Sequence, residues 1–130
     1  MTSGATRILL VDDEPALLES MRAYLARLGH TVAAFPNAAS AWECFAAVGA
    51  AFQVVIVDLT LEGMPGEEFI AKVLERDPAV AVLATSGYSM SLLKLGPQGG
   101  RVGTLQKPFT PRMLTDALER LLAGEPGAAR

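Results

Sequence analysis

The sequence predicts one α/β domain built on a doubly wound, five-stranded parallel sheet with the strand order 2-1-3-4-5. Three observations lead to this prediction. Short apolar segments alternate with longer segments of helical periodicity, which is the pattern of consecutive βα units. The apolar segments have hydrophobic residues on both faces, as buried parallel strands do. Most of them also end in polar residues, which is typical of strands that lead into a ligand site.

Five segments are expected to form the strands, because each is short, apolar and often β-branched. They are Ile8–Val11, Thr31–Phe35, Phe52–Val57, Val80–Ala84 and Val102–Leu105.

The first helix is predicted over Glu14–Leu28, where leucine and methionine recur at helical spacing. Pro15 suits its first turn and Gly29 suits its end. A second helix is expected to begin after Asn37, whose side chain is a good N-cap, and to run to about Val48.

Apolar spacing predicts two later helices, one marked by Phe69–Leu74 and the last by Met113–Leu122. Between them, a short helix is expected over Tyr88–Leu95, before the glycines and the proline of residues 96–100. The chain is therefore read as one domain over residues 1–123, followed by a disordered tail over residues 124–130.

Composition excludes several classes of function. The formal charge is -3 and the basic residues are scattered, which argues against a nucleic-acid surface on this chain. No apolar stretch reaches the length of about 18 residues that suggests a membrane span. Cys44 is the single cysteine, so no intrachain disulfide can form, and a cytoplasmic location is expected because the first residues do not resemble a signal peptide.

Four side chains stand out for other reasons. Trp42 and Phe45 are expected to lie in the core, and Cys44 between them is expected to be a partly buried structural thiol. His30 follows a glycine in a turn and is expected to be exposed.

Polar residues follow four of the five predicted strands. In a sheet of this order, the carboxyl ends of strands one and three flank the crevice where ligands bind, so the acidic residues should converge there. These residues are Asp12, Asp13 and Glu14 after the first strand, Asp58 after the third, Thr85 and Ser86 after the fourth, and Lys107 and Pro108 after the fifth.

Such a cluster has a definite chemistry. Three carboxylates in one crevice repel one another and raise one another's pKa values, and a hard divalent cation such as Mg²⁺ removes that repulsion. With an ammonium and a hydroxyl nearby, the arrangement suits a phosphoryl group, and a carboxylate can act as the nucleophile. Each residue alone is an ordinary strand end, helix start or turn, but their occurrence at successive strand ends argues against coincidence.

Four segments together resemble the receiver domain of response regulators and hybrid sensor kinases. The resemblance spans about Arg7 to Leu122 and implies the flavodoxin-like (βα)5 receiver fold. The segments that carry it are Ile8–Glu14 (ILLVDDE), Val57–Leu59 (VDL), Thr85–Tyr88 (TSGY) and Leu105–Thr110 (LQKPFT).

The resemblance implies a role for each matching position. Asp58 would accept a phosphoryl group from a phosphohistidine. Asp13 would bind Mg²⁺ directly, Asp12 directly or through water, and Asp58 and the backbone carbonyl of Thr60 would complete the protein ligands. Lys107 would pair with the phosphoryl oxygens.

The same resemblance assigns Ser86 as the switch hydroxyl and implies a cis peptide bond before Pro108. Two departures from the family pattern stand out. Thr104 occupies the position where many receivers have an aromatic switch residue. The usual Met-Pro pair after the acceptor comes three residues late, as Met64–Pro65, although the loop still reaches Gly66 at the usual distance.

The expected function is therefore a signalling module rather than an enzyme: a free-standing response regulator or the C-terminal receiver of a hybrid kinase. Its partners would be a histidine kinase or phosphotransfer protein and a downstream protein target, and a homodimer would use the fourth helix, fifth strand and fifth helix. The alternative is a Mg²⁺-dependent phosphatase or phosphotransferase that forms an aspartyl phosphate. Such an enzyme needs an acid two residues after the nucleophile, where this chain has Thr60. A cofactor binder of the flavodoxin type would need a glycine- or hydroxyl-rich loop after the first strand, where this chain has acids.

Overall fold

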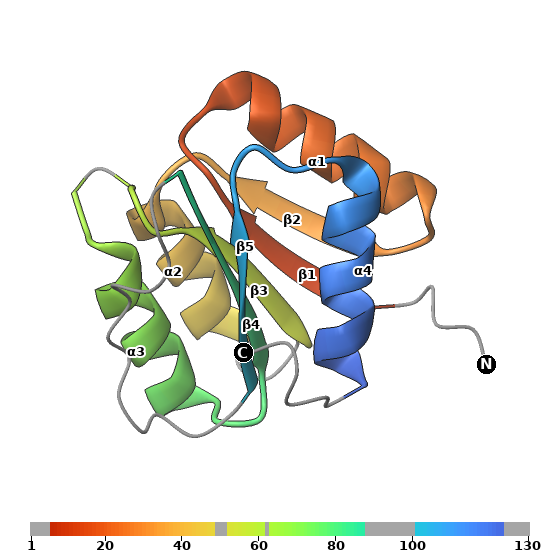
Figure 1. Cartoon of the computed structure of the whole chain (residues 1–130). Helices are drawn as coiled ribbons and strands as arrows, with labels where there is room; N and C mark the ends of the chain where they lie inside the picture. The colour runs from red at the N-terminus through yellow and green to blue at the C-terminus, as the bar shows by residue number, and fades with distance from the viewer. Residues whose placement is uncertain (1–5, 49–51, 62, 88–100, 124–130) are drawn as a thin grey trace.

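The computed structural model describes residues 6–48, 52–61, 63–87 and 101–123. Its five strands form one parallel sheet in the order β2-β1-β3-β4-β5 (Figure 1), as the sequence predicts. The strands are β1 (Arg7–Val11), β2 (Thr31–Phe35), β3 (Val54–Asp58), β4 (Ala81–Ser86) and β5 (Arg101–Gln106).

In the described part of the chain, four helices connect and cover these strands. The helix predicted over Tyr88–Leu95 and the tail of residues 124–130 lie outside the described residues, so the helix predicted as the fifth is α4 here. Among the described residues, no helix has both the length and the apolar character needed to cross a membrane. The helices are α1 (Pro15–Arg27), α2 (Ala38–Val48), α3 (Gly66–Arg76) and α4 (Pro111–Leu122).

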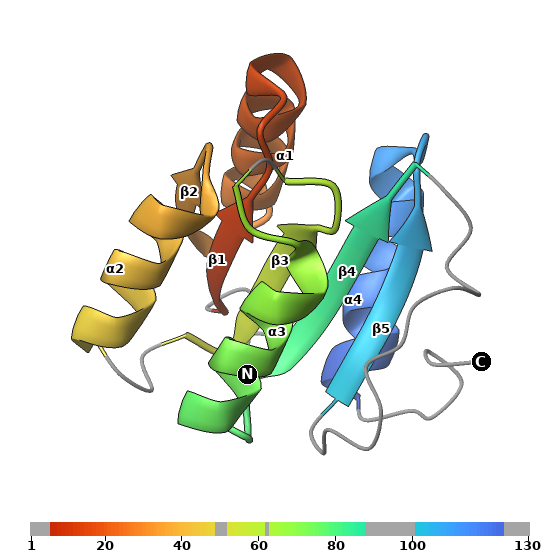
Figure 2. The same ribbon diagram turned by 90° about the vertical axis from the view of Figure 1, so that its left-hand side faces the viewer.

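The helices form two layers, one on each face of the sheet. Figure 2 looks onto the face covered by α2 and α3, with α1 and α4 behind the sheet. Alternation along β1 supplies both cores: Leu9 and Val11 pack with α2 and α3, whereas Ile8 and Leu10 pack with α1 and α4. Both faces of the central strands are thereby buried, which leaves the strand ends as the place for polar side chains.

The helix starts follow from capping chemistry. Pro15 occupies the first turn of α1. The Asn37 side chain accepts a hydrogen bond of 2.8 Å from the Ser40 N–H, which confirms the predicted cap of α2. Thr110 caps α4 in the same way, accepting a bond of 3.1 Å from the Met113 N–H.

The end of α1 is a Schellman turn. Gly29 has a φ of 101°, its N–H donates to the Ala26 carbonyl (3.0 Å), and the His30 N–H donates to the Leu25 carbonyl (3.2 Å). The turn brings residue 30 back toward the helix. His30 is consequently half-buried, and the prediction that it is exposed is wrong.

The residues expected in the core of α2 lie there. Phe45 is fully buried, and Trp42 packs against the same cluster from a partly buried position. Trp42 also makes an edge contact with Phe69 of α3, with ring centroids 6.4 Å apart. Cys44 is partly buried, as predicted.

Candidate functional site

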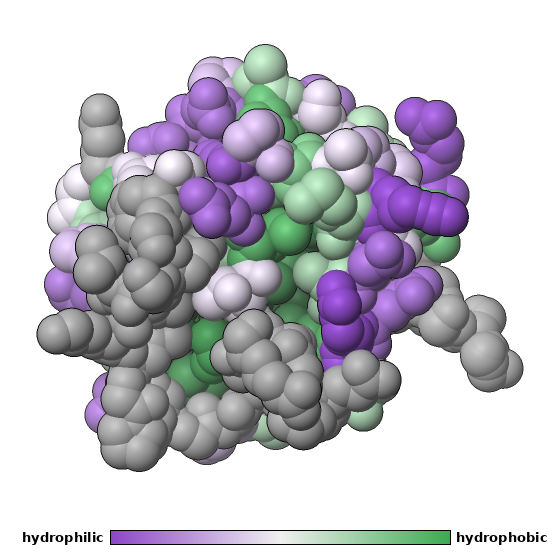
Figure 3. Space-filling view, in the orientation of Figure 1, coloured by the Kyte–Doolittle hydropathy of each residue, from purple (hydrophilic) through white to green (hydrophobic). Residues whose placement is uncertain are grey.

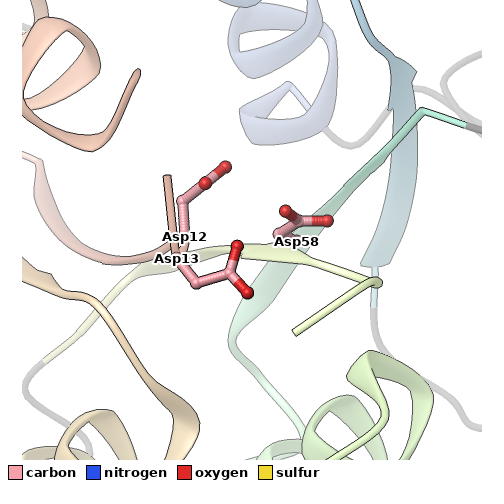
Figure 4. Close-up of side chains that lie close together, drawn as sticks. All are labelled: Asp12, Asp13 and Asp58. Atoms are coloured by element: carbon pink, nitrogen blue, oxygen red, sulfur yellow. The ribbon is translucent and has the colours of Figure 1, made fainter. Parts of the chain in front are cut away.

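The acidic residues lie at the carboxyl ends of β1 and β3, which are neighbours in the sheet. Val11 is in register with Val57, so the residues that follow these positions emerge side by side. Figure 4 shows Asp12 and Asp13 at one strand end and Asp58 at the next, around a common space. The convergence predicted from strand order is confirmed.

The three aspartates can offer oxygen atoms to one cation. One carboxylate oxygen from each of Asp12, Asp13 and Asp58 lies within 4.8 Å of the others. Asp12 and Asp58 are buried and Asp13 is half-buried. An all-oxygen set of this kind fits a hard divalent cation and does not offer the nitrogen or sulfur ligands that zinc prefers.

Lys107 supplies positive charge to this cluster. Its ammonium nitrogen lies 3.0 Å from Asp58 Oδ2, 3.1 Å from Asp12 Oδ2 and 3.4 Å from Glu14 Oε1. Partial burial acts to lower the pKa of Lys107, but the hydrogen bonds to Asp58 and Asp12 outweigh it and raise the pKa well above that of a free lysine. Lys107 is therefore a firmly charged group between two buried carboxylates.

The backbone at the start of α1 holds the Asp12 side chain in place. Its Oδ1 accepts a hydrogen bond of 2.9 Å from the Glu14 N–H. Burial raises the pKa of Asp12, while the bond from Glu14 and the contact with Lys107 oppose this, and the charge of Asp58 adds to the increase. The sequence predicts that clustered carboxylates raise one another's pKa values; for Asp12 the direction is confirmed, with desolvation as the larger cause.

The second oxygen of Asp58 is fixed by Thr60. Asp58 Oδ1 accepts hydrogen bonds from the Thr60 N–H (2.9 Å) and the Thr60 hydroxyl (2.8 Å). Sequence reasoning considered only the Thr60 carbonyl and missed this hydroxyl, as it missed the ion pair between Glu14 and Lys107. The Asp-x-Thr spacing was an available signal, since aspartate commonly bonds to the backbone two residues on.

The ends of β4 and β5 complete the surroundings. Ser86 is the last residue of β4 and is fully buried. Its carbonyl accepts a hydrogen bond of 2.7 Å from the Lys107 N–H, which ties the two strand ends together. Thr104 is half-buried on β5, in register with Ala84. The cis peptide bond predicted before Pro108 is present.

The loop from β3 to α3 packs against the end of β3 at a glycine. The Gly66 N–H donates to the Leu59 carbonyl over 3.3 Å. A Cβ on residue 66 would lie 2.4 Å from Leu59 Cα, so only glycine allows this approach. The late Met64–Pro65 pair thus leaves the loop anchored at the expected residue.

Comparison with known proteins identifies the family. The family description that matches residues 8–119 is "response regulator receiver domain". The chain is 31% identical over 120 residues to the C4-dicarboxylate transport transcriptional regulatory protein DctD of Rhizobium meliloti, covering 91% of this chain and 25% of that protein. It is 28% identical over 117 residues to the response regulator receiver protein CpdR of Brucella abortus, covering 89% and 96%.

The structural comparison agrees. The chemotaxis response regulator CheY4 of Vibrio cholerae matches with a TM-score of 0.79 at 27% identity, covering 90% of this chain and 98% of that one. The chain spans about a quarter of the length of the first curated relatives, at 25%, 26% and 25%. The sheet order, the acidic cluster and these matches lead to one conclusion: the chain belongs to the response regulator receiver domain family of two-component signalling.

Proposed function

We propose that Asp58 is the phosphoacceptor of this receiver. The observation that carries the proposal is that the Asp58 carboxylate lies between the Lys107 ammonium, 3.0 Å away, and the oxygens of Asp12 and Asp13. A phosphoryl group on Asp58 would have a fixed cation on one side and a metal-binding carboxylate pair on the other. Asp12 also contacts Lys107, at 3.1 Å, so the choice of Asp58 rests in addition on its match to the acceptor position of the receiver pattern.

The chemistry proposed is transfer from a phosphohistidine. An Asp58 oxygen attacks phosphorus, the bond between phosphorus and the imidazole nitrogen breaks, and the imidazole leaves with its electron pair. The products are an acyl phosphate on Asp58 and a free histidine on the donor. Lys107 is placed to neutralise the phosphoryl oxygens, and Ser86, at the end of the adjacent strand, is the hydroxyl assigned to bind one of them.

Mg²⁺ is the cation we assign to the acidic cluster. Asp12, Asp13, Asp58 and the Thr60 carbonyl would hold it, and oxygen ligands with room for water and substrate oxygens suit its preferences. When bound, it supplies charge neutralisation at the phosphoryl oxygens. A phosphatase of the alternative class needs an acid at residue 60. Here that residue is Thr60, whose hydroxyl donates a hydrogen bond to Asp58.

The partner that delivers the phosphoryl group is assigned to the groove between α1 and the start of α4. Two adjoining pockets share Leu17 and Phe109, and one of them reaches Lys107. Figure 3 shows apolar side chains on the face between α1 and α4. An apolar groove that reaches Lys107, which contacts Asp58, fits a helix that presents a phosphohistidine. The proposal also includes a downstream protein target, a homodimer through the β5–α4 side and a cytoplasmic location.

Phosphoryl transfer with intact-mass detection tests the proposal. Acetyl phosphate with Mg²⁺, and separately a phosphorylated histidine kinase, should add one phosphoryl mass to the wild type. Asp58→Asn should abolish that mass from both donors, while Asp116→Asn, which changes an exposed aspartate on α4, should leave it unchanged. Undiminished labelling of Asp58→Asn would refute the assignment.

A further inference from the structure

Glu14 lies beside the acidic cluster without being one of the three aspartates that can share a cation. Its Oε1 lies 3.4 Å from the Lys107 ammonium nitrogen, and that nitrogen lies 3.0 Å from Asp58 Oδ2. Together these distances place Glu14 Oε1 no more than about 6.4 Å from Asp58 Oδ2, which is less than the screening length of about 8 Å at physiological ionic strength. The charge of Glu14 therefore acts on any ion that binds at Asp58.

The side chain of Glu14 is not needed for the local hydrogen bonds. Glu14 is the N-cap residue of α1, but its side chain makes no capping hydrogen bond. The bond that holds Asp12 comes from the Glu14 N–H, and the Glu14 side chain itself is 66% exposed. Replacing the carboxylate by an amide thus changes one charge and leaves the backbone bonds of the site in place.

Glu14 is also the negative charge that the cations of the site do not balance. Asp12, Asp13 and Asp58 surround a common space (Figure 4) and can share one divalent cation. The charges of that cation and of Lys107, which contacts Asp58, together equal those of the three aspartates. The carboxylate of Glu14 then gives the site a net negative charge when the cation is bound. A phosphoryl donor is an anion, so this charge opposes its approach.

The position of Glu14 places this charge next to an incoming donor. Glu14 and Lys107 line the same pocket, together with Leu17 and Phe109 of the groove assigned above to the protein donor. A donor that occupies this pocket lies beside the Glu14 carboxylate when its phosphoryl group meets Lys107. The repulsion therefore acts at the point where the donor binds and reacts.

We propose that Glu14 selects phosphoryl donors by charge, and disfavours acyl phosphates relative to donors that transfer from nitrogen. The proposal rests on the function proposed for Asp58. Acetyl phosphate, an acyl phosphate, carries two negative charges at neutral pH. Phosphoramidate carries one net negative charge because its nitrogen is protonated, and phosphohistidine also transfers from a nitrogen that binds a proton. Repulsion grows with the charge of the donor, so Glu14 slows the acyl phosphate more.

The two small donors react with Asp58 in the same way. An Asp58 oxygen attacks phosphorus in each case. The P–O bond of acetyl phosphate breaks and acetate leaves with the electron pair, whereas the P–N bond of phosphoramidate breaks and ammonia leaves with the electron pair and the proton that its nitrogen already holds. The product on Asp58 is the same acyl phosphate, so a difference between the donors reports on their approach and departure.

Labelling rates of Glu14→Gln and wild type, followed by intact mass, test the proposal. At low ionic strength and with Mg²⁺ saturating each protein, the variant should react with acetyl phosphate about three- to eightfold faster than the wild type. With phosphoramidate the factor should be the square root of this, about two- to threefold, because its logarithm is proportional to the charge of the donor. In 1 M KCl, where the screening length is about 3 Å, both factors should fall close to one.

Glu119→Gln is the matched control. It makes the same substitution at an exposed position of α4, in a pocket shared with Thr6 at the opposite end of β1 from Asp12. That distance is roughly 20 Å, at about 3.3 Å per strand residue, so the control should change neither rate.

Beryllofluoride provides a measurement that involves no transfer. It is a singly charged anion that occupies the place of the phosphoryl group. By NMR titration at low ionic strength, Glu14→Gln should bind it about two- to threefold more tightly than the wild type, and the two affinities should converge in 1 M KCl. A purely structural role of Glu14 at the start of α1 would change the melting temperature without this dependence on salt and on donor charge.

Three results would overturn the proposal: unchanged rates, equal factors for the two donors, or factors that persist in 1 M KCl. The last two would show that Glu14 acts by holding Lys107 rather than through its charge on the donor. In each of these cases the function proposed for Asp58 still stands if Asp58→Asn takes up no phosphoryl mass. A wild type that is labelled by neither donor would refute that function, and the proposal for Glu14 with it.

Discussion

Replacing the site lysine isolates what it does when no metal is bound. Lys107→Gln keeps the length and polarity of the side chain but removes its charge from between two carboxylates that are 2% exposed. Hydrogen bonds to charged groups contribute roughly 1.5–3 kcal/mol each. The glutamine amide retains part of this hydrogen-bond energy. Solvent screens another part of it, because the side chain of Lys107 is 17% exposed. We expect the free energy of unfolding to fall by about 3 kcal/mol in EDTA.

The pH of the measurement follows from the pKa of Lys107. Because that pKa is raised in the folded state, the stabilisation by Lys107 is fully present below the unfolded value of about 10.4 and is lost only when the pH rises through the folded value. Urea unfolding at neutral pH therefore measures the whole effect. Thermal unfolding should show a loss of about 10 °C for a chain of this size.

Mg²⁺ should raise the free energy of unfolding of Lys107→Gln more than that of the wild type. The ion neutralises the same carboxylates that Lys107 contacts. At a Mg²⁺ concentration of about 100 times the variant's dissociation constant, binding therefore raises the free energy of unfolding of the variant by roughly 2.7 kcal/mol. In the wild type, Lys107 and the ion compete for Asp12 and Asp58, and the gain is smaller. The control is Lys72→Gln, which removes an ammonium 4.6 Å from the Trp42 ring centroid and should lose at most about 1 kcal/mol, with no change in the response to Mg²⁺. Equal Mg²⁺ increments in Lys107→Gln and wild type would refute the reasoning.

Two further predictions concern the metal and the partner. Asp13→Asn should weaken Mg²⁺ binding roughly tenfold or more and raise the melting temperature in EDTA, because it removes one of the three mutually repelling carboxylates; an unchanged thermal-shift titration would contradict this. Phe109→Ala should slow transfer from a phosphorylated histidine kinase about tenfold without slowing labelling by acetyl phosphate, whereas Met113→Ala, on an exposed side chain of α4, should affect neither. Parallel loss with both donors would place the role of Phe109 in the chemistry or the fold rather than in docking.

Sheet order and strand positions were predictable because they depend on periodicity and topology. The alternation of Leu9 and Leu10 between two cores follows from the pleat of a strand. The convergence of Asp12 and Asp58 follows from the rule that ligand sites lie at the carboxyl ends of parallel strands. Strand ends were less exact: Phe52 is buried but lies before β3, and β4 continues through Ser86.

Side-chain detail was harder to predict for a physical reason. Whether Thr60 turns its hydroxyl toward Asp58, and whether Glu14 reaches Lys107, depends on rotamers that sequence spacing leaves open. His30 was misplaced because a residue after a helix and a glycine is usually in solvent, whereas the Schellman turn returns it to the protein. The helix predicted over Tyr88–Leu95 lies outside the described residues and stays a prediction.

Residue 104 is a threonine rather than an aromatic, and this changes how a phosphoryl group on Asp58 would alter the conformation of the domain. Phosphorylation adds negative charge where carboxylates already outnumber the Lys107 ammonium, so that ammonium would be drawn from Glu14 and Asp12 toward the new oxygens. Ser86, bonded through its carbonyl to the Lys107 N–H at 2.7 Å, would be drawn to the same group. We therefore expect the ends of β4 and β5 to be coupled through this backbone hydrogen bond rather than by a swinging ring, and their movement to pass into the connection that leads to α4. An effector that distinguishes the two states must then contact that connection, because a ligand shifts an equilibrium only through contacts that differ between its states.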